Sequence, residues 1–378
     1  MNVRGMNFDG ITNKVVFLYL FIVVCFAASM FFVQHNHSLY ERPIAEITET
    51  KLIDSSETID MKDNKDHLYN QSIVGELKNG KEKGQEILLE NTFSASGTVD
   101  QEYRVGDDVF VLIEKKGSSS HLSGSIVELK RDTYILFVVW VFIVVLLLVG
   151  KKQGLFSIIS LAVNALILSY GLDIYVHSEK ISLLFISGIS IILFTVISLL
   201  LINGSNEKTY AAIIATILGT FASLLITYTV MWLSSDNGLH YEEMQFLTRH
   251  YKTVFLAGLF IGSLGAVMDV AITMSSSIFG LYEEKPDISI KALKASGMEI
   301  GKDIMGTMTN ILFFAYVSGS IPILVLYLKN GTPLFYTLSM NLSLELARAL
   351  AGGIGIVLTI PIGLYISILL VQRKKARA

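Results

Sequence analysis

Apolar runs separated by short polar segments dominate the chain and predict eight helices that cross a membrane. Spanning the hydrocarbon core takes about 20 helical residues. Short connectors, including a break at 150–154, divide the runs. The predicted spans are residues 15–33, 134–149, 155–176, 181–202, 209–233, 253–279, 303–328 and 342–371.

The first run is expected to stay as an anchor. A cleaved signal peptide has a shorter apolar core that ends at a small-residue site. Here Ala27, Ala28 and Ser29 offer a weak site, and the apolar run continues to Val33. An uncleaved first span is therefore the prediction.

Small and polar residues recur every three or four positions in the span at 253–279. This spacing places them on one face of a helix, and the face is expected to point into the bundle. A carboxylate in a span costs at least about 2.5 kcal/mol unless it faces protein or water. The predicted pathway residues of this span are Asp269, Thr273 and Ser276, and the predicted helix-packing residues are Gly258, Gly262 and Gly265.

The following span, 303–328, repeats the pattern with Asp303, Thr307 and Asn310 on one face. Polar groups inside spans mark ion or substrate pathways by default. A protonated Asp269 that only hydrogen-bonds a neighbouring helix is the structural alternative. Together these six residues are the predicted pathway for an ion or solute.

The last span carries Glu345 and Arg348, which are three residues apart and so on one helix face. Either they pair with each other or they belong to the pathway. Thr332–Asn341 is predicted to be a short amphipathic link before this span. Pro361 is expected to kink the helix.

Residues 34–132 differ from the rest of the chain. Residues 34–70 are polar and acidic with little periodicity, so a flexible arm is predicted. From Gln71, short alternating runs between turn residues predict a small β domain over 71–132. Its predicted strands are Ile73–Leu77, Glu86–Leu89, Asp108–Ile113 and Ser125–Leu129. A structural or partner-binding domain is favoured over an enzyme, because no catalytic constellation is present.

Composition supports a polytopic membrane protein, with 52% hydrophobic and 17% charged residues against about 25% charged in a soluble domain. The single cysteine, Cys25, excludes an internal disulfide. Zinc-protease and P-loop motifs are absent from the sequence, so no enzyme activity and no cofactor are expected. The loop 234–252 holds His240, Glu242, Glu243 and His250, but a solvated loop is favoured there over a metal site.

Lysine and arginine predict the orientation. With eight spans, the loops on the side of the termini hold thirteen and the opposite short loops hold four, Lys180, Arg249, Lys252 and Lys329. Residues 1–14 and the basic tail 372–378 are therefore expected to be cytoplasmic. The segment 34–132 would lie outside, and residues 133–371 would form a seven-helix membrane domain.

Several stretches resemble the YibE/YibF family of bacterial multi-pass membrane proteins. They are GSLGAVMDVAITMSSSIFGLYEEKPDIS, ALKASGMEIGKDIMGTMTN, YRVGDDVFV and GKKQGLFSIISLAVN. The resemblance runs from about Gln71 onward and leaves out the arm 34–70. It implies the longer, YibE-like type with an external domain, a permease-like protein of the bacterial plasma membrane, and a shorter YibF-like membrane protein as partner.

Two functions follow as expectations. The first is a permease for a small solute, coupled to protons or cations through Asp269. The second is a non-transporting scaffold or sensor whose external domain binds a protein or a cell-envelope component. The lipid bilayer is the expected surroundings, and no nucleic-acid partner is expected.

Overall fold

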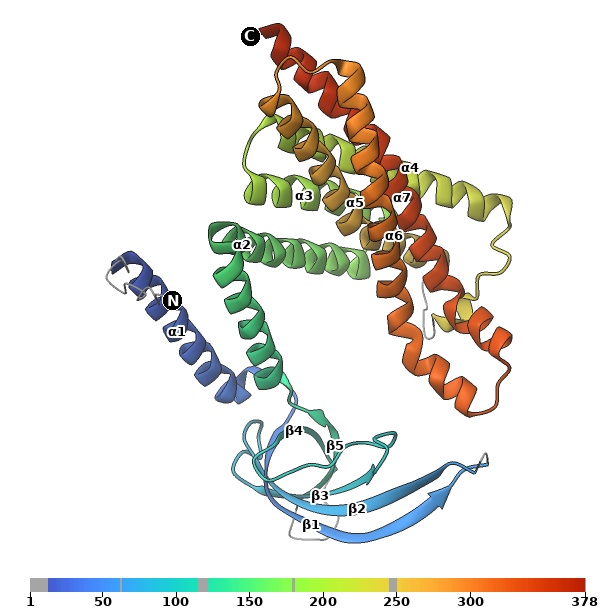
Figure 1. The fold of residues 1–378 in the computed structure, drawn as a ribbon. Helices are drawn as coiled ribbons and strands as arrows, with labels where there is room; N and C mark the ends of the chain where they lie inside the picture. Colours follow the sequence, from blue (N-terminus) through green and yellow to red (C-terminus); the bar gives the residue numbers. More distant parts are fainter. Residues whose placement is uncertain (1–12, 62, 115–121, 179–180, 245–249, 378) are drawn as a thin grey trace, which may run out of the picture. The chain divides into compact units, whose positions relative to one another are not determined.

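The computed structural model describes residues 13–377 except 62, 115–121, 179–180 and 245–249 (Figure 1). The chain divides into two compact units, residues 1–145 and residues 146–378.

The first unit contains a closed five-stranded barrel with strand order β1-β2-β3-β5-β4. All pairs are antiparallel except β3 with β5, and β1 closes the barrel by pairing with both β2 and β4. This connectivity is that of an OB-type barrel. The strands are β1 (Ile44–Ile59), β2 (Lys65–Leu77), β3 (Glu86–Ser94), β4 (Asp108–Ile113) and β5 (Leu122–Leu129).

Alternation of apolar and polar residues builds the barrel. In β3 every second residue is buried, beginning with Ile87 and Leu89, because successive side chains of a strand point to opposite faces. These residues join Ala45, Ile73 and Val109 in one apolar core. The four predicted strands are confirmed as parts of β2, β3, β4 and β5.

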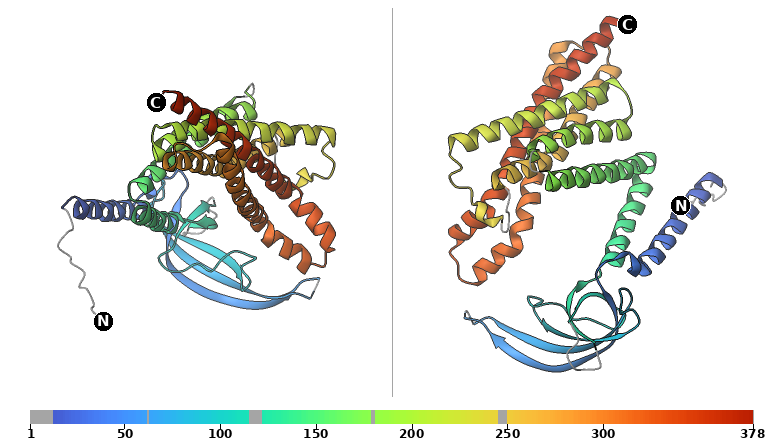
Figure 2. Two further views of the ribbon diagram at one scale, coloured as in Figure 1. Left: turned by 45° about the horizontal axis from the view of Figure 1, so that its top comes forward. Right: turned by 180° about the vertical axis from the view of Figure 1, so that it is seen from behind.

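The predicted flexible arm at residues 34–70 is wrong. Strand β1 and the first part of β2 occupy it, Ala45 and Ile47 lie in the barrel core, and Ile44 is buried. The error has a physical cause, since residues 54–59 of β1 pair with residues 65–70 of β2 beyond the barrel core. This paired segment, called here the β1–β2 ribbon, extends from the barrel (Figure 2). Residues 54–59 are all exposed, so this part of β1 lacks the alternation that marks a half-buried strand.

Two apolar helices flank the barrel in sequence. Helix α1 spans Asn13–Gln34, and helix α2 begins at Asp132. Trp140 of α2 donates a hydrogen bond from Nε1 to Ser29 Oγ of α1 at 2.8 Å, and its ring meets Phe26 edge to face. The two helices therefore contact each other within the first unit.

Helix α2 (Asp132–His177) has non-helical backbone at Lys151, with φ 47° and ψ −119°. This position lies in the break predicted at 150–154. The remaining helices are α3 (Leu183–Asn203), α4 (Glu207–Leu233), α5 (Tyr251–Glu284), α6 (Ile290–Lys329) and α7 (Leu334–Arg377).

Six of the described helices, α2 to α7, are long and apolar enough to cross a membrane, and α1 contains a shorter apolar stretch at Leu20–Gln34. The expected eight crossings require α1 to span as well and α2 to span twice around Lys151, and these remain predictions. Helix α6 begins at Ile290, thirteen residues before the expected start of the span, because Ser289 caps it by accepting a hydrogen bond from the Ala292 N–H. The predicted link at 332–341 is wrong, since α7 already starts at Leu334.

Helix α7 organises the second unit, because α4, α5 and α6 all pack on it. Small residues permit these close approaches. At Gly219 of α4, an added Cβ would lie 2.0 Å from Thr359 Oγ1 of α7. At Gly301 of α6, it would lie 2.3 Å from Ile360 Cγ2 of α7.

We expect Gly219→Ala to destabilise the helical unit by about 1–3 kcal/mol, the usual range for overpacking a filled interior. The new methyl group forces α4 away from Thr359, whose hydroxyl is held by a hydrogen bond to the Gly355 carbonyl. Thermal unfolding of the purified protein in detergent measures the effect. Gly319→Ala is the matched control, since a Cβ at Gly319 meets nothing within 4 Å. Equal melting temperatures for the two variants would contradict the packing argument.

Candidate functional site

The polar stripe of α5 lies on the open face of this helix in the second unit. Four of its residues are exposed: Gly258, Gly262, Gly265 and Asp269. The other two, Thr273 and Ser276, are half-buried. The opposite side of α5 is buried among other helices; it includes Phe255, Leu256, Leu259, Phe260, Val267 and Val270. The face was expected to point into the bundle, and within residues 146–378 it points away from the packed core.

Helix α6 shows the same arrangement. Asp303, Thr307 and Asn310 are exposed, and the Thr307 hydroxyl donates to the Ile304 carbonyl at 2.9 Å. The buried side of α6 carries Gly297 and Gly301, which approach Leu364 and Ile360 of α7. The polar face and the packed face of α6 are therefore different faces.

Two contacts fix the antiparallel register of α5 and α6. A Cβ at Gly262 would lie 2.3 Å from Tyr316 Oη, and a Cβ at Gly297 would lie 2.5 Å from Ile278 Cδ1. Interpolation between these contacts places Asp269 at the level of Thr307 and places Asp303 at the level of Thr273. The two carboxylates therefore differ in level by about 6 Å, or roughly four residues of helix.

The predicted helix-packing glycines behave differently from one another. Gly262 lies against Tyr316 of α6, whereas an added Cβ at Gly258 or Gly265 meets nothing within 4 Å in the described chain. Glycine in a membrane helix allows another backbone to approach closely. Gly258 and Gly265 thus leave room for a helix that lies outside this packed core.

Glu345 and Arg348 form an ion pair on α7, with Arg348 Nη1 donating to Glu345 Oε1. The guanidinium also lies over the Phe255 ring of α5, 5.3 Å from its centroid. A cation over an aromatic face gains energy when it is partly desolvated. The Arg348 guanidinium therefore links α7 to α5 through a cation–π contact.

Three described cavities of the second unit have mainly apolar linings. The first, of about 550 Å³, lies between Leu184 and Tyr228; the second, of about 360 Å³, is near Thr309 and Gly353; the third, of about 490 Å³, is around Ile167 and Phe185. Neither Asp269 nor Asp303 lines any of these three. The predicted pathway residues therefore lie on open helix faces rather than in these cavities.

The first unit has a buried polar cluster where α1 and α2 meet the barrel, called here the barrel root. Asn79 is 6% exposed and receives the Ile44 N–H on Oδ1 at 2.6 Å. Its Nδ2 donates to the carbonyls of His37, Tyr40 and Arg42, all at 2.9–3.0 Å. One side chain thus holds the segment between α1 and β1 in place.

Lys130 and Asp132 form a second part of the barrel root. The Lys130 side chain is 1% exposed, lies 3.5 Å from Asp132 Oδ2 and donates to the Val33 carbonyl at the end of α1 at 2.8 Å. Tyr40 donates its hydroxyl to Asp132, and this bond to a carboxylate raises the pKa of Tyr40. The start of α2, the end of α1 and the barrel are tied together by these bonds.

Sequence reasoning missed the barrel root. Asn79 stands in an Asn-Gly pair that indicates a turn, and Gly80 indeed has φ 83°. The only other signal was the charged sequence Lys130-Arg131-Asp132 directly before an apolar run. Neither pattern indicates that the side chains are buried.

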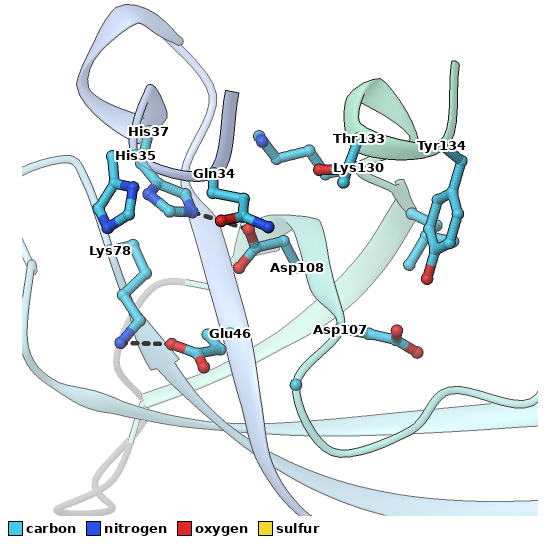
Figure 3. Close-up of a pocket in the computed structure, with 12 residues that line it drawn as sticks. Gln34, His35, His37, Glu46, Lys78, Asp107, Asp108, Lys130, Thr133 and Tyr134 are labelled. Carbon is cyan, nitrogen blue, oxygen red and sulfur yellow. Dashed lines mark hydrogen bonds and ion pairs between the residues drawn. The ribbon is translucent and has the colours of Figure 1, made fainter. Parts of the chain in front are cut away.

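A polar cavity of about 590 Å³ opens at the barrel root (Figure 3). His37 Nε2 lies 2.7 Å from Asp108 Oδ2, and Lys78 Nζ lies 2.7 Å from Glu46 Oε2. The hydrogen bond to Glu46 raises the pKa of Lys78, so this side chain is charged at neutral pH. The other residues that line the cavity are Gln34, His35, Gly106, Asp107, Leu129, Lys130, Thr133 and Tyr134.

No group of three or more His, Cys, Asp or Glu side chains that could hold a metal ion occurs among the described residues. This finding extends to the loop with His240 and Glu242, apart from residues 245–249, which lie outside the described part. His240 Nδ1 and Glu242 Oε2 are 3.7 Å apart.

Comparison with known proteins agrees with the two-part organisation. Residues 138–373 match the model described as YibE/F-like protein, and residues 38–129 match the YibE/F family N-terminal domain. The second match begins at residue 38, so the likeness includes residues 38–70, which the sequence-based resemblance left out. No curated protein and no solved structure matches the chain. Because the two models together cover most of the chain, this protein is a membrane protein of the YibE/F family.

Proposed function

We propose that the protein is a permease that moves a small solute across the membrane, with Asp269 as the carboxyl that binds the coupling proton or cation. The observation that carries the proposal is the polar face of α5 and α6. Six residues with carboxyl, hydroxyl or amide groups are exposed or half-buried on two helices that are long and apolar enough to cross a membrane: Asp269, Thr273, Ser276, Asp303, Thr307 and Asn310.

Contact with lipid is unfavourable for the polar face of α5 and α6. A charged side chain within a span faces water or protein, because hydrocarbon offers it no hydrogen bonds. Open glycines at Gly258 and Gly265 leave space for a further helix beside Asp269. The proposed pathway therefore runs along α5 and α6 and is closed on its open side by another helical surface, such as that of a shorter YibF-like protein.

The second candidate is a membrane scaffold or sensor without transport. The apolar linings of the three described cavities in the helical unit favour it, as does the polar cavity at the barrel root. Under this alternative Asp269 is protonated and hydrogen-bonds a neighbouring helix. Neither candidate assigns an enzymatic reaction to the chain.

Flux measurements separate the two candidates. The purified protein is reconstituted in liposomes that contain a trapped pH-sensitive dye, and gradients of H⁺, Na⁺ or K⁺ are imposed. The permease proposal expects the dye to respond faster than in protein-free liposomes for at least one gradient. Untargeted comparison of metabolites in cells with and without the protein then narrows the solute class. Unchanged dye responses together with unchanged metabolites would favour the scaffold.

The proposed orientation has both termini in the cytoplasm of a bacterial cell and residues 34–132 outside the plasma membrane. It rests on the thirteen-to-four distribution of lysine and arginine over the loops. In a Cys25→Ser background, Met61→Cys is expected to react with an impermeant maleimide in intact cells, since Met61 is fully exposed. Arg373→Cys should react only after lysis, and the reverse labelling pattern would overturn the orientation.

A further inference from the structure

The barrel-root cavity lies between the ends of two apolar helices and the barrel. Gln34 is the last residue of α1, and Thr133 and Tyr134 lie in the first turn of α2. All three line the cavity together with residues of β1 and β4. If α1 and α2 cross the membrane as proposed, the cavity lies at the level of the lipid head groups. This inference rests on that crossing and not on transport.

Two kinds of polar groups line the two ends of the cavity. Gln34 and Thr133, near the helix ends, offer an amide and a hydroxyl as hydrogen-bond donors, and Figure 3 shows them along one side. The Lys130 side chain is buried and already bound to the Val33 carbonyl and to Asp132. Glu46 and Asp107, on the side of the barrel, offer carboxylates, and Asp108 lies between the two groups in the same view. Lys78 lies on the barrel side as well, where it is paired with Glu46.

The charges leave one carboxylate available. Glu46 and Glu76 both bind Lys78, and Asp132 accompanies Lys130. Asp108 accepts from His37. Asp107 accepts the Arg104 backbone N–H at 2.8 Å, and no ion pair is recorded for it among the described residues. A cation in this cavity would therefore find its partner at Asp107.

We infer that the barrel-root cavity binds the head group of phosphatidylethanolamine. The phosphate lies against the Gln34 amide and the Thr133 hydroxyl, and the primary ammonium donates to Asp107. The cavity volume of about 590 Å³ lies within the roughly 300–1,000 Å³ of small-molecule sites. The acyl chains follow α1 and α2 into the bilayer, so the phosphate lies toward the helix ends and the ammonium lies toward Asp107.

Two features of the ligand can be separated by chemistry. Phosphatidylcholine has the same phosphate but a quaternary ammonium without N–H donors. Phosphatidylglycerol has the phosphate but no cation. A charge-assisted hydrogen bond to Asp107 is stronger than a neutral one, so retention of the ethanolamine lipid is expected to exceed that of either competitor by about ten-fold.

The experiment uses the full-length protein in nanodiscs that contain equal amounts of the three lipids. Lipid that remains bound after transfer to detergent is quantified by native mass spectrometry. Enrichment of phosphatidylethanolamine over both competitors supports the site. Equal retention of the ethanolamine and choline lipids would overturn it. Binding of soluble phosphoethanolamine is tested in parallel. Binding of this soluble compound without enrichment of the lipid would overturn the assignment to a lipid.

Asp107→Asn tests the residue. The asparagine Oδ1 can still accept the Arg104 N–H, so the barrel is expected to keep its melting temperature while the enrichment falls to the level of the choline lipid. Glu57→Gln is the matched control, because Glu57 pairs with Lys65 in the β1–β2 ribbon, away from the residues that line the cavity. Unchanged enrichment in Asp107→Asn would refute the role of Asp107. A proton or cation flux result has no bearing on this outcome.

Discussion

Asp269→Asn is expected to abolish coupled flux in reconstituted liposomes while the yield of folded protein stays unchanged. Asparagine preserves the size and the hydrogen-bonding capacity of the side chain but cannot release or take up a proton. A permease that binds its coupling ion at this carboxyl loses the ion and thus the driving force. Flux under an imposed proton or cation gradient measures the effect, and size-exclusion chromatography measures the fold.

Asp287→Asn is the matched control for this change. Asp287 is an exposed carboxylate in the connection between α5 and α6, outside both helices, so its loss should leave flux unaltered. Asp269→Leu separates the alternatives further, because leucine removes the hydrogen-bonding capacity of the side chain as well as its ability to bind and release a proton. Full flux in Asp269→Asn, with poor folding of Asp269→Leu, would show that the residue only joins helices.

Asn79→Ala is expected to lower the free energy of unfolding of the barrel by at least about 3 kcal/mol. The change removes the partner of the buried Ile44 N–H and of three backbone carbonyls, those of His37, Tyr40 and Arg42. Each buried polar group left without a partner costs about 1–3 kcal/mol. Limited proteolysis of the full-length protein measures the effect as faster cleavage between α1 and β1.

Asn70→Ala provides the comparison for Asn79→Ala. Asn70 donates to Asp54 at 2.7 Å and accepts from Thr92 at 2.7 Å, but these bonds are on the exposed surface. Water replaces the lost partners there, so the expected change is below about 1 kcal/mol. Similar cleavage rates in the two variants would mean that the barrel-root network does not stabilise the barrel.

The sequence was sufficient for features that depend on local periodicity. Strand β4 was predicted with its observed bounds, because Val109 and Val111 point into the core between two turn segments. The breaks between the apolar helices followed from short polar segments, and the break in α2 is at Lys151. Strand β1 was missed because only its first residues contribute to the core, and its residues from 51 to 59 are all exposed, so no alternation marks them.

The direction of the polar face of α5 could not be predicted from spacing. Periodicity shows which residues share a face, but the packed side of a membrane helix can be as apolar as a side in contact with lipid. Phe255, Leu259 and Val270 are buried against other helices here, whereas Asp269 is exposed. The choice between the two faces depends on the shape of α4 and α7, including Gly219 and Gly355.

The partners of the barrel root were also beyond sequence reasoning. Asn79 bonds to backbone groups 35–42 residues away, and Lys130 bonds to Val33, 97 residues away. Nothing in a local window indicates such separations. The six pathway residues remain a sequence-based prediction, to which the structure adds their shared register and their position on open faces.

The β1–β2 ribbon is expected to open locally more often than the barrel does. Residues 54–59 pair only with residues 65–70 among the described strands, and residues 65–67 lie beyond the pairing of β2 with β3. Large apolar side chains such as Ile59 and Met61 stay exposed near the tip. Backbone amides there are held by little burial, so they should open without global unfolding. Their hydrogens are expected to exchange with deuterium orders of magnitude faster than those of Ile73 and Leu89 in the barrel core. The ribbon tip would thus sample many conformations while the barrel below it keeps one.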